Sequence, residues 1–188
     1  RVGNAMSIWG TAVPNLVKNR GRRSTRNTKT FTWPDGTMSA RFVTRNNKRN
    51  IESIFYSRSK RSQRYHRPDD NPAYLMFHSD GDIAIVQWCV DGDLSVVRLS
   101  AGLPSLWMGN VFYWEYEHGR HNTNGPSWIK ASGECGFAID DNHITADEFK
   151  ERYLITHLEE YVEVDAKALY NKLYLEMMEY VQQELLNT

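Results

Sequence analysis

Residues 83–99 read Ile83-Ala-Ile-Val-Gln-Trp-Cys-Val-Asp91-Gly92-Asp-Leu-Ser-Val-Val-Arg-Leu99, and this stretch has the pattern of a β-hairpin. Apolar and β-branched residues, which favour strands, lie on both sides of an Asp-Gly pair. Asp-Gly suits a two-residue hairpin turn because both positions tolerate the positive φ angles that such turns require. We therefore predict strands over residues 83–90 and 94–99, joined by a turn at Asp91-Gly92.

The same sequence pattern, short apolar runs separated by turn pairs, extends from Phe31 to about Ile144. The other turn pairs are Asp35-Gly36, Asn46-Asn47, Asp80-Gly81, His118-Gly119 and Asp141-Asn142. Three segments share one design, an apolar run followed by a turn that ends in glycine: 31–36, 76–81 and 128–133. Such recurrence in a fixed order indicates one supersecondary unit used several times, each copy burying a face against its neighbour.

One stretch of this region carries a resemblance to a known class of proteins. Trp114-Glu-Tyr-Glu-His-Gly-Arg-His121-Asn-Thr-Asn-Gly-Pro-Ser127 resembles the tandem β-hairpin repeats of MORN-like, His-Arg-x-Asp-Gly-Pro-Ala type found in phages and large DNA viruses. A partial copy, His66-Arg-Pro-Asp-Asp-Asn-Pro-Ala73, has one extra residue, and a third copy at 46–50 has lost most of the signature. The resemblance covers about residues 31–145 and implies the repeat architecture. The class has no common catalytic residues to carry over.

Residues 145–188 have a helical pattern instead. Thr145-Ala-Asp-Glu148 has the form of a capping box, and Asp165 is placed to cap a second helix. The second helix carries an apolar stripe of Leu169, Tyr170, Leu173, Met177, Tyr180 and Val181. This stripe either packs on the β-layer or binds another chain, in which case the contact residues are Tyr170, Leu173, Met177 and Tyr180.

These patterns predict the fold class and the organisation of the chain. We expect an α+β protein, an antiparallel β-hairpin repeat meander followed by a C-terminal helical element. The expected divisions are a basic N-terminal arm at residues 1–30, the repeat domain at 31–145 and the C-terminal helices at 146–188.

The net charge of zero conceals a strong separation of charge along the chain. Residues 1–68 contain 16 Lys and Arg against 2 Asp and Glu, whereas residues 69–188 contain 7 against 21. Arginine, the commoner cation here, suits phosphate through its forked donors. We therefore predict that the basic half either binds a polyanion or docks on carboxylates of its own or a neighbouring chain. The predicted nucleic-acid-binding residues are Arg20, Arg22, Arg23, Arg26, Lys29, Arg45, Lys48, Arg49, Arg58, Lys60, Arg61, Arg64 and Arg67.

A search for catalytic chemistry yields no pattern that predicts an enzyme. His118 and His121 are near a predicted turn and have no third ligand at a useful spacing, so no metal site is expected. His66 and His121 lie beside polar turn residues, which favours a role in hydrogen-bonding the turns. We expect no catalytic residues, no cofactor and no metal.

The sequence therefore predicts a non-catalytic binding protein, of viral or phage origin if the resemblance holds. The expected partner is nucleic acid or an acidic protein surface, engaged by the basic N-terminal region. The alternative is a protein-interaction module, a virion component or an inhibitor of a host protein, acting through the repeat face or the C-terminal helix, which could also form a homo-oligomer. No apolar stretch reaches the length of a membrane helix, so we expect no membrane partner and a location in the host cytoplasm or a virion.

Overall fold

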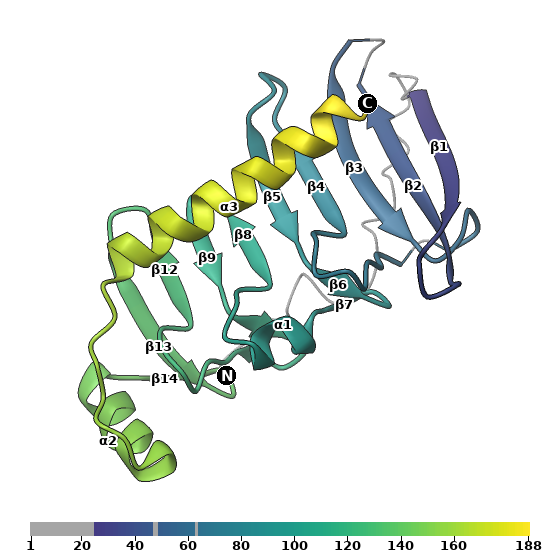
Figure 1. Ribbon diagram of the computed structural model, residues 1–188. Helices are drawn as coiled ribbons and strands as arrows, with labels where there is room; N and C mark the ends of the chain where they lie inside the picture. Colours follow the sequence, from purple (N-terminus) through teal and green to yellow (C-terminus); the bar gives the residue numbers. More distant parts are fainter. Residues whose placement is uncertain (1–24, 47–48, 63) are drawn as a thin grey trace, which may run out of the picture. The chain divides into compact units, whose positions relative to one another are not determined.

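The computed structural model describes residues 25–46, 49–62 and 64–188, which form an antiparallel β-meander followed by helices (Figure 1). The predicted α+β fold class is confirmed. The chain divides into two compact units, one of residues up to Leu94 together with Glu184–Thr188, the other Ser95–Gln183. The boundaries expected at residues 30 and 145 divide the chain by its sequence pattern and stay predictions.

The first unit is a meander of antiparallel strands in which neighbours in sequence pair with one another. Its strands are β1 (Thr25–Thr32), β2 (Met38–Arg45), β3 (Ile51–Ser57), β4 (Tyr74–Phe77), β5 (Ile83–Gln87), β6 (Cys89–Val90) and β7 (Asp93–Leu94). The strand β1 begins at Thr25, inside the segment that we expected to be an arm. Sequence reading missed it because β1 is the end strand of its sheet and most of its side chains are exposed, so no apolar alternation marks it.

The strand register of the first unit sorts its side chains into two faces. One face carries the cross-strand row Val43, Ile54, Leu75 and Val86, all buried. The other face carries aromatic rings, with Phe42 stacked on Phe55 at 4.5 Å between ring centroids. Because successive residues of a strand point to opposite faces, Arg41 and Tyr56 share the face of Val43 and Ile54.

The predicted hairpin at residues 83–99 is right at its turn and wrong after it. Asp91 and Gly92 have φ angles of 54° and 96°, as a two-residue hairpin turn requires, and they join β6 to β7. The second strand, however, ends at Leu94, and residues expected to extend it form the short helix α1 (Val96–Ser100). Ser95 caps this helix, its side chain accepting a hydrogen bond from the Arg98 N–H.

The second unit contains its own antiparallel strand pairs and two longer helices. Its strands are β8 (Leu106–Met108), β9 (Val111–Tyr113), β10 (Glu115–Tyr116), β11 (Gly119–Arg120), β12 (Trp128–Lys130), β13 (Cys135–Ile139) and β14 (Asn142–Ile144). The helix α2 (Ala146–His157) begins with the predicted capping box of Thr145 and Glu148. Asp165 caps α3 (Ala166–Leu186) by accepting a hydrogen bond from the Ala168 N–H, as predicted.

The two units contain the same histidine-centred turn, which confirms an internal repeat. Nδ1 of His66 accepts a hydrogen bond from the Asp91 N–H at 3.1 Å, and Nδ1 of His121 accepts one from the Asp140 N–H at 3.1 Å. The backbone agrees, since the His66 N–H donates to Tyr56 and the His121 N–H donates to Trp114. Each histidine therefore holds a hairpin turn in place by accepting a backbone hydrogen bond, the role that the sequence favoured.

The His66 contact makes stability depend on pH. Burial lowers the pKa of His66, and the charge of Arg58 lowers it further, which together outweigh the opposite effect of Asp91. A lowered pKa means that the neutral ring stabilises the fold fully above the ordinary histidine pKa of about 6.5, and that this stabilisation is lost as the pH falls below it. Protonated Nδ1 can no longer accept the Asp91 N–H.

We expect the free energy of unfolding to fall between pH 7.5 and pH 5.5, and His66→Asn to reduce that fall. The asparagine side-chain oxygen can accept the same hydrogen bond without titrating in this range. Urea denaturation at the two pH values measures the difference. His78→Asn, at an exposed position, is the control, and an equal pH dependence in both variants would contradict the assignment.

Candidate functional site

The two repeats differ at the residue that follows the histidine, and this difference marks the candidate site. In the second unit this residue is Asn122, whose amide donates to the Pro126 carbonyl and accepts from the Asn124 N–H. In the first unit it is Arg67, which donates to Asp69 at 2.7 Å and to Glu184 at 3.1 Å. Asn122 is satisfied within its own loop, whereas Arg67 takes part in a larger cluster of charges.

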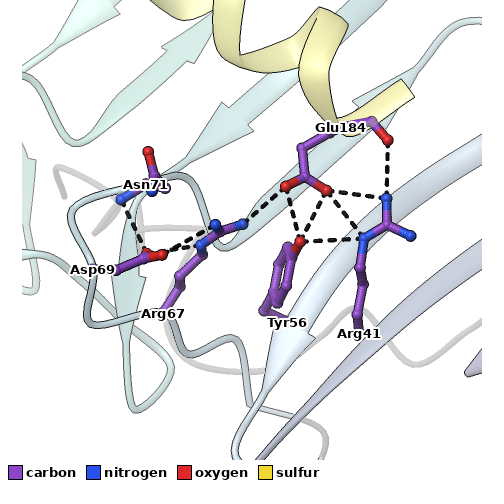
Figure 2. Close-up of polar contacts among 6 residues, drawn as sticks. All are labelled: Arg41, Tyr56, Arg67, Asp69, Asn71 and Glu184. Carbon is purple, nitrogen blue, oxygen red and sulfur yellow. Dashed lines mark hydrogen bonds and ion pairs between the residues drawn. The ribbon is translucent and has the colours of Figure 1, made fainter. Parts of the chain in front are cut away.

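The centre of this cluster is the carboxylate of Glu184, in the last turn of α3 (Figure 2). It accepts hydrogen bonds from Nε of Arg41 at 3.0 Å, from the Tyr56 hydroxyl at 2.8 and 2.9 Å, and from Nη1 of Arg67. Nη2 of Arg41 also donates to the backbone carbonyl of Glu184 at 3.0 Å. Two guanidinium groups and a phenol therefore converge on one carboxylate.

The strand register explains why these donors meet. Arg41 of β2 is paired with Tyr56 of β3 on one side and with Lys29 of β1 on the other. These three residues form one cross-strand row on the same face, because directly paired residues point to the same side of the sheet. Arg67 enters from the connection between β3 and β4. The meander thus gathers three cations and a phenol within one small area.

Burial and ion pairing set the electrostatics of this cluster. Arg41 is only 8% exposed and Glu184 only 6% exposed, and each has its charge compensated by the other. Burial raises the pKa of Tyr56 to about 12, so its hydroxyl keeps its proton and donates at neutral pH. Burial alone would raise the pKa of Asp69, but hydrogen bonds from Arg67 and Asn71 and the charge of Arg67 outweigh it and hold the pKa low.

A cavity of about 370 Å³ lies beside the cluster in the first unit. It is lined by Lys29, Phe31, Trp33, Arg41, Tyr56, Arg67 and Asn187. The rings of Phe31 and Trp33 meet edge to face at 4.7 Å, and the Arg67 guanidinium lies 4.1 Å from the centroid of Tyr56. The indole N–H of Trp33 is buried and has no acceptor among the described residues. The cavity therefore combines aromatic surface and cations.

The structure separates the predicted nucleic-acid-binding residues into three groups. Arg20, Arg22, Arg23 and Lys48 lie outside the described residues. Arg26, Lys29, Arg49, Arg58, Lys60, Arg61 and Arg64 are exposed, and Arg45 is half-buried. Arg67 alone points its charge inward, with 9% of its side chain exposed. Arg67 is therefore corrected from a surface contact to a member of the Glu184 cluster.

Two of the exposed arginines also have partners within the chain. The Arg58 guanidinium forms two hydrogen bonds with the Asp91 carboxylate, and these hold the pKa of Asp91 below its usual value. The Arg26 guanidinium lies over the ring of Phe42, 4.1 Å from its centroid. The sequence had allowed for contacts between the basic half and carboxylates of the acidic half, and Arg58 and Arg41 make such contacts.

The apolar stripe of α3 is directed inward. Tyr170, Leu173 and Met177 are buried, and Tyr180 is half-buried. Tyr170 packs against Phe112 at 5.2 Å and accepts a hydrogen bond from the Trp107 indole. Of the two roles predicted for the stripe, packing within the chain is the one observed for Tyr170, Leu173 and Met177. Their burial leaves them little surface for a partner.

Sequence reasoning missed Glu184, although a signal for it was present. Positions 173, 177, 181 and 184 follow the helical spacing of the stripe, so a carboxylate stands where the pattern calls for an apolar residue. A charged residue on a buried stripe needs a partner of opposite charge. That partner, Arg41, is 143 residues away, and no local pattern could identify it.

Other possible sites have fewer groups that could bind a ligand or react. Burial raises the pKa of the Cys89 thiol to about 12, which leaves it protonated at neutral pH. A second cavity, of about 310 Å³, lies in the second unit beside His121 and Tyr116 and is lined by no Lys, Arg, Asp or Glu. Within the described ranges, no group of three His, Cys, Asp or Glu is placed to hold a metal ion, and no helix is long and apolar enough to cross a membrane.

Comparisons with family models, curated proteins and solved structures give no match to this chain. The likeness to MORN-like viral repeats therefore stays a prediction from the sequence. The site has to be interpreted from its own geometry.

We expect Glu184→Ala to lower the free energy of unfolding by about 3 kcal/mol, because it leaves buried arginine charge without its partner. Urea denaturation measures the loss. Glu179→Ala is the matched control on an exposed face of the same helix, where a change within about 0.5 kcal/mol is expected. Equal losses in the two variants would show that the cluster does not stabilise the fold.

Proposed function

We propose that this chain is a non-catalytic binding protein that holds a polyanion, such as nucleic acid, on the exposed cations of its first unit. The observation that carries the proposal is a set of exposed cations that form no ion pair among the described residues: Lys29, Arg49, Lys60, Arg61 and Arg64. Cations that a fold needs for itself are paired with carboxylates, as Arg41 and Arg67 are. Unpaired exposed cations leave a positive field that attracts phosphates.

The chemistry of these cations suits contacts with a phosphate backbone. The connection between β3 and β4 carries three of them, Lys60, Arg61 and Arg64, within five residues. Arginine donates through a planar fork that matches phosphate oxygens, and contacts of this kind carry no base preference. We therefore propose binding that depends on salt and little on base sequence. A viral origin and a place in the host cytoplasm or a virion belong to the same proposal, through the sequence resemblance.

The triple variant Lys60→Ala/Arg61→Ala/Arg64→Ala tests this surface. We expect it to weaken binding of a fluorescent single-stranded oligonucleotide at low salt and to reduce the slope of log K against log salt by about 2, since each lost phosphate contact on a single strand removes about 0.7. Fluorescence anisotropy across a salt series measures both quantities, with DNA and RNA strands of equal length.

The matched control is Lys150→Ala/Lys167→Ala/Lys172→Ala, which removes three exposed lysines from the second unit. It changes the net charge by the same amount and should leave the slope unchanged. Absence of binding at low salt, or equal loss in both triple variants, would overturn the proposed function.

A second candidate function, association with a protein, is favoured by exposed apolar residues at the end of α2. Ile155, Leu158 and Val162 are 75%, 90% and 78% exposed. Apolar side chains grouped in one segment favour a protein contact.

If the partner is a second copy, light scattering should give a dimer mass at high concentration, and replacing Ile155, Leu158 and Val162 by serine should restore the monomer. Val96→Ser/Val97→Ser is the control, and a monomer mass for the unchanged chain would count against self-association.

A further inference from the structure

We infer that Arg41, Tyr56 and Arg67 form a receptor for a phosphate group, that Glu184 of the chain occupies this receptor, and that a ligand phosphate competes with Glu184 for it. The choice of a nucleic-acid phosphate as the ligand rests on the proposed function. The receptor itself rests on the geometry of the first unit, and it is tested below with inorganic phosphate.

The first argument is the set of donors. Arg41, Tyr56 and Arg67 direct N–H and O–H groups at two carboxylate oxygens over distances of 2.8 to 3.1 Å. Two of the donors lie on strands β2 and β3, and Arg67 lies in the connection from β3 to β4. The acceptor, Glu184, lies on the helix α3. A phosphate offers the same kind of anionic oxygen acceptors in larger number, and guanidinium groups bind both anions in similar geometry.

The second argument is the balance of charge. Arg41 and Arg67 both pair with Glu184, and Arg67 also pairs with Asp69, so the Glu184 carboxylate is shared by two guanidinium groups. Lys29, the exposed cross-strand neighbour of Arg41, adds a further cation to the lining of the cavity. A phosphate that carries one or two negative charges would balance this set as well as or better than Glu184 does.

The third argument is that the cavity beside the cluster has enough volume for a ligand. The cavity of about 370 Å³ is lined by the same Arg41, Tyr56 and Arg67 that bind Glu184. A volume of this size is within the range of small-ligand sites and exceeds the needs of a phosphate alone. Phe31 and Trp33 add aromatic surface to the cavity. The ligand that fits is a phosphate joined to a planar ring, as in a nucleotide.

The fourth argument is that Glu184 can leave without disturbing the sheet. It lies in the last turn of α3, which ends at Leu186, and last turns fray more readily than helix interiors. A carboxylate in the last turn is also opposed by the helix dipole, and this turn contains no basic residue to offset it. The position of Glu184 is thus explained by the receptor and is unfavourable for the helix.

The decisive variant is Glu184→Gln, which keeps the size of the side chain and removes the competing charge. We expect it to bind inorganic phosphate at least tenfold more tightly than the unchanged chain, because a site closed by a buried ion pair is open less than one-tenth of the time and binds more weakly by that fraction. Thermal unfolding across a phosphate series, with chloride at equal ionic strength, measures the affinity. Glu179→Gln, which makes the same charge change at an exposed position, is the control.

A second measurement uses the unchanged chain, so the test does not depend on the folding of a variant. Hydrogen exchange of the amides in Glu184–Thr188 should speed up when phosphate replaces chloride, because phosphate releases the last turn. No change in exchange, or equal phosphate affinity in Glu184→Gln and Glu179→Gln, overturns the receptor.

An oligonucleotide arm identifies the source of the phosphate. Tighter binding of both the oligonucleotide and inorganic phosphate by Glu184→Gln supports the receptor with strand phosphates as its ligand. Tighter binding of inorganic phosphate alone supports the receptor with a small phosphorylated ligand instead. Failure of every variant to bind the oligonucleotide would overturn the proposed function and would leave the phosphate result to decide the receptor separately.

Discussion

A carboxylate buried in a protein has to be compensated by charge and hydrogen bonds, and in this chain Glu184 is compensated by Arg41, Tyr56 and Arg67. The buried arginines need compensation as well, and the Glu184 carboxylate provides it for both Arg41 and Arg67. Removing Glu184 would leave the buried Arg41 without its carboxylate. The cluster therefore determines how the last turn of α3 lies in the first unit.

The two units share a histidine-centred turn that stabilises their hairpins. In each unit a histidine ring accepts the N–H of an aspartate in a turn, at His66 and at His121. The residue after the histidine is where the units diverge, Asn122 being satisfied in its own loop while Arg67 reaches Glu184. Shared features of the repeat hold the hairpins together. The feature found in one unit only is the better candidate for function.

The exposed cations and the inward arginines belong to one basic segment but differ in their partners within the chain. Arg41 and Arg67 stabilise the fold through Glu184, and Arg58 holds the turn at Asp91. Lys60, Arg61 and Arg64 form no such pair among the described residues and face solvent. Counting basic residues along the chain cannot separate these two groups, because they differ in which carboxylates the fold brings near.

The sequence alone determined the features that depend on neighbours in the chain. These include the strands and turns of the meander, the left-handed turn at Asp91-Gly92, and the helix caps at Thr145 and Asp165, because φ preferences, side-chain alternation and capping act over a few residues. It also indicated the hydrogen-bonding role of His66 and His121. Where the local signal was weak the prediction failed, as at the exposed end strand β1 and at α1, where the cap at Ser95 prevailed over the β-branched residues after it. Only the tertiary structure decided that Arg41 and Glu184 form one site, because compensation of a buried charge depends on distance in space and these residues are 143 positions apart.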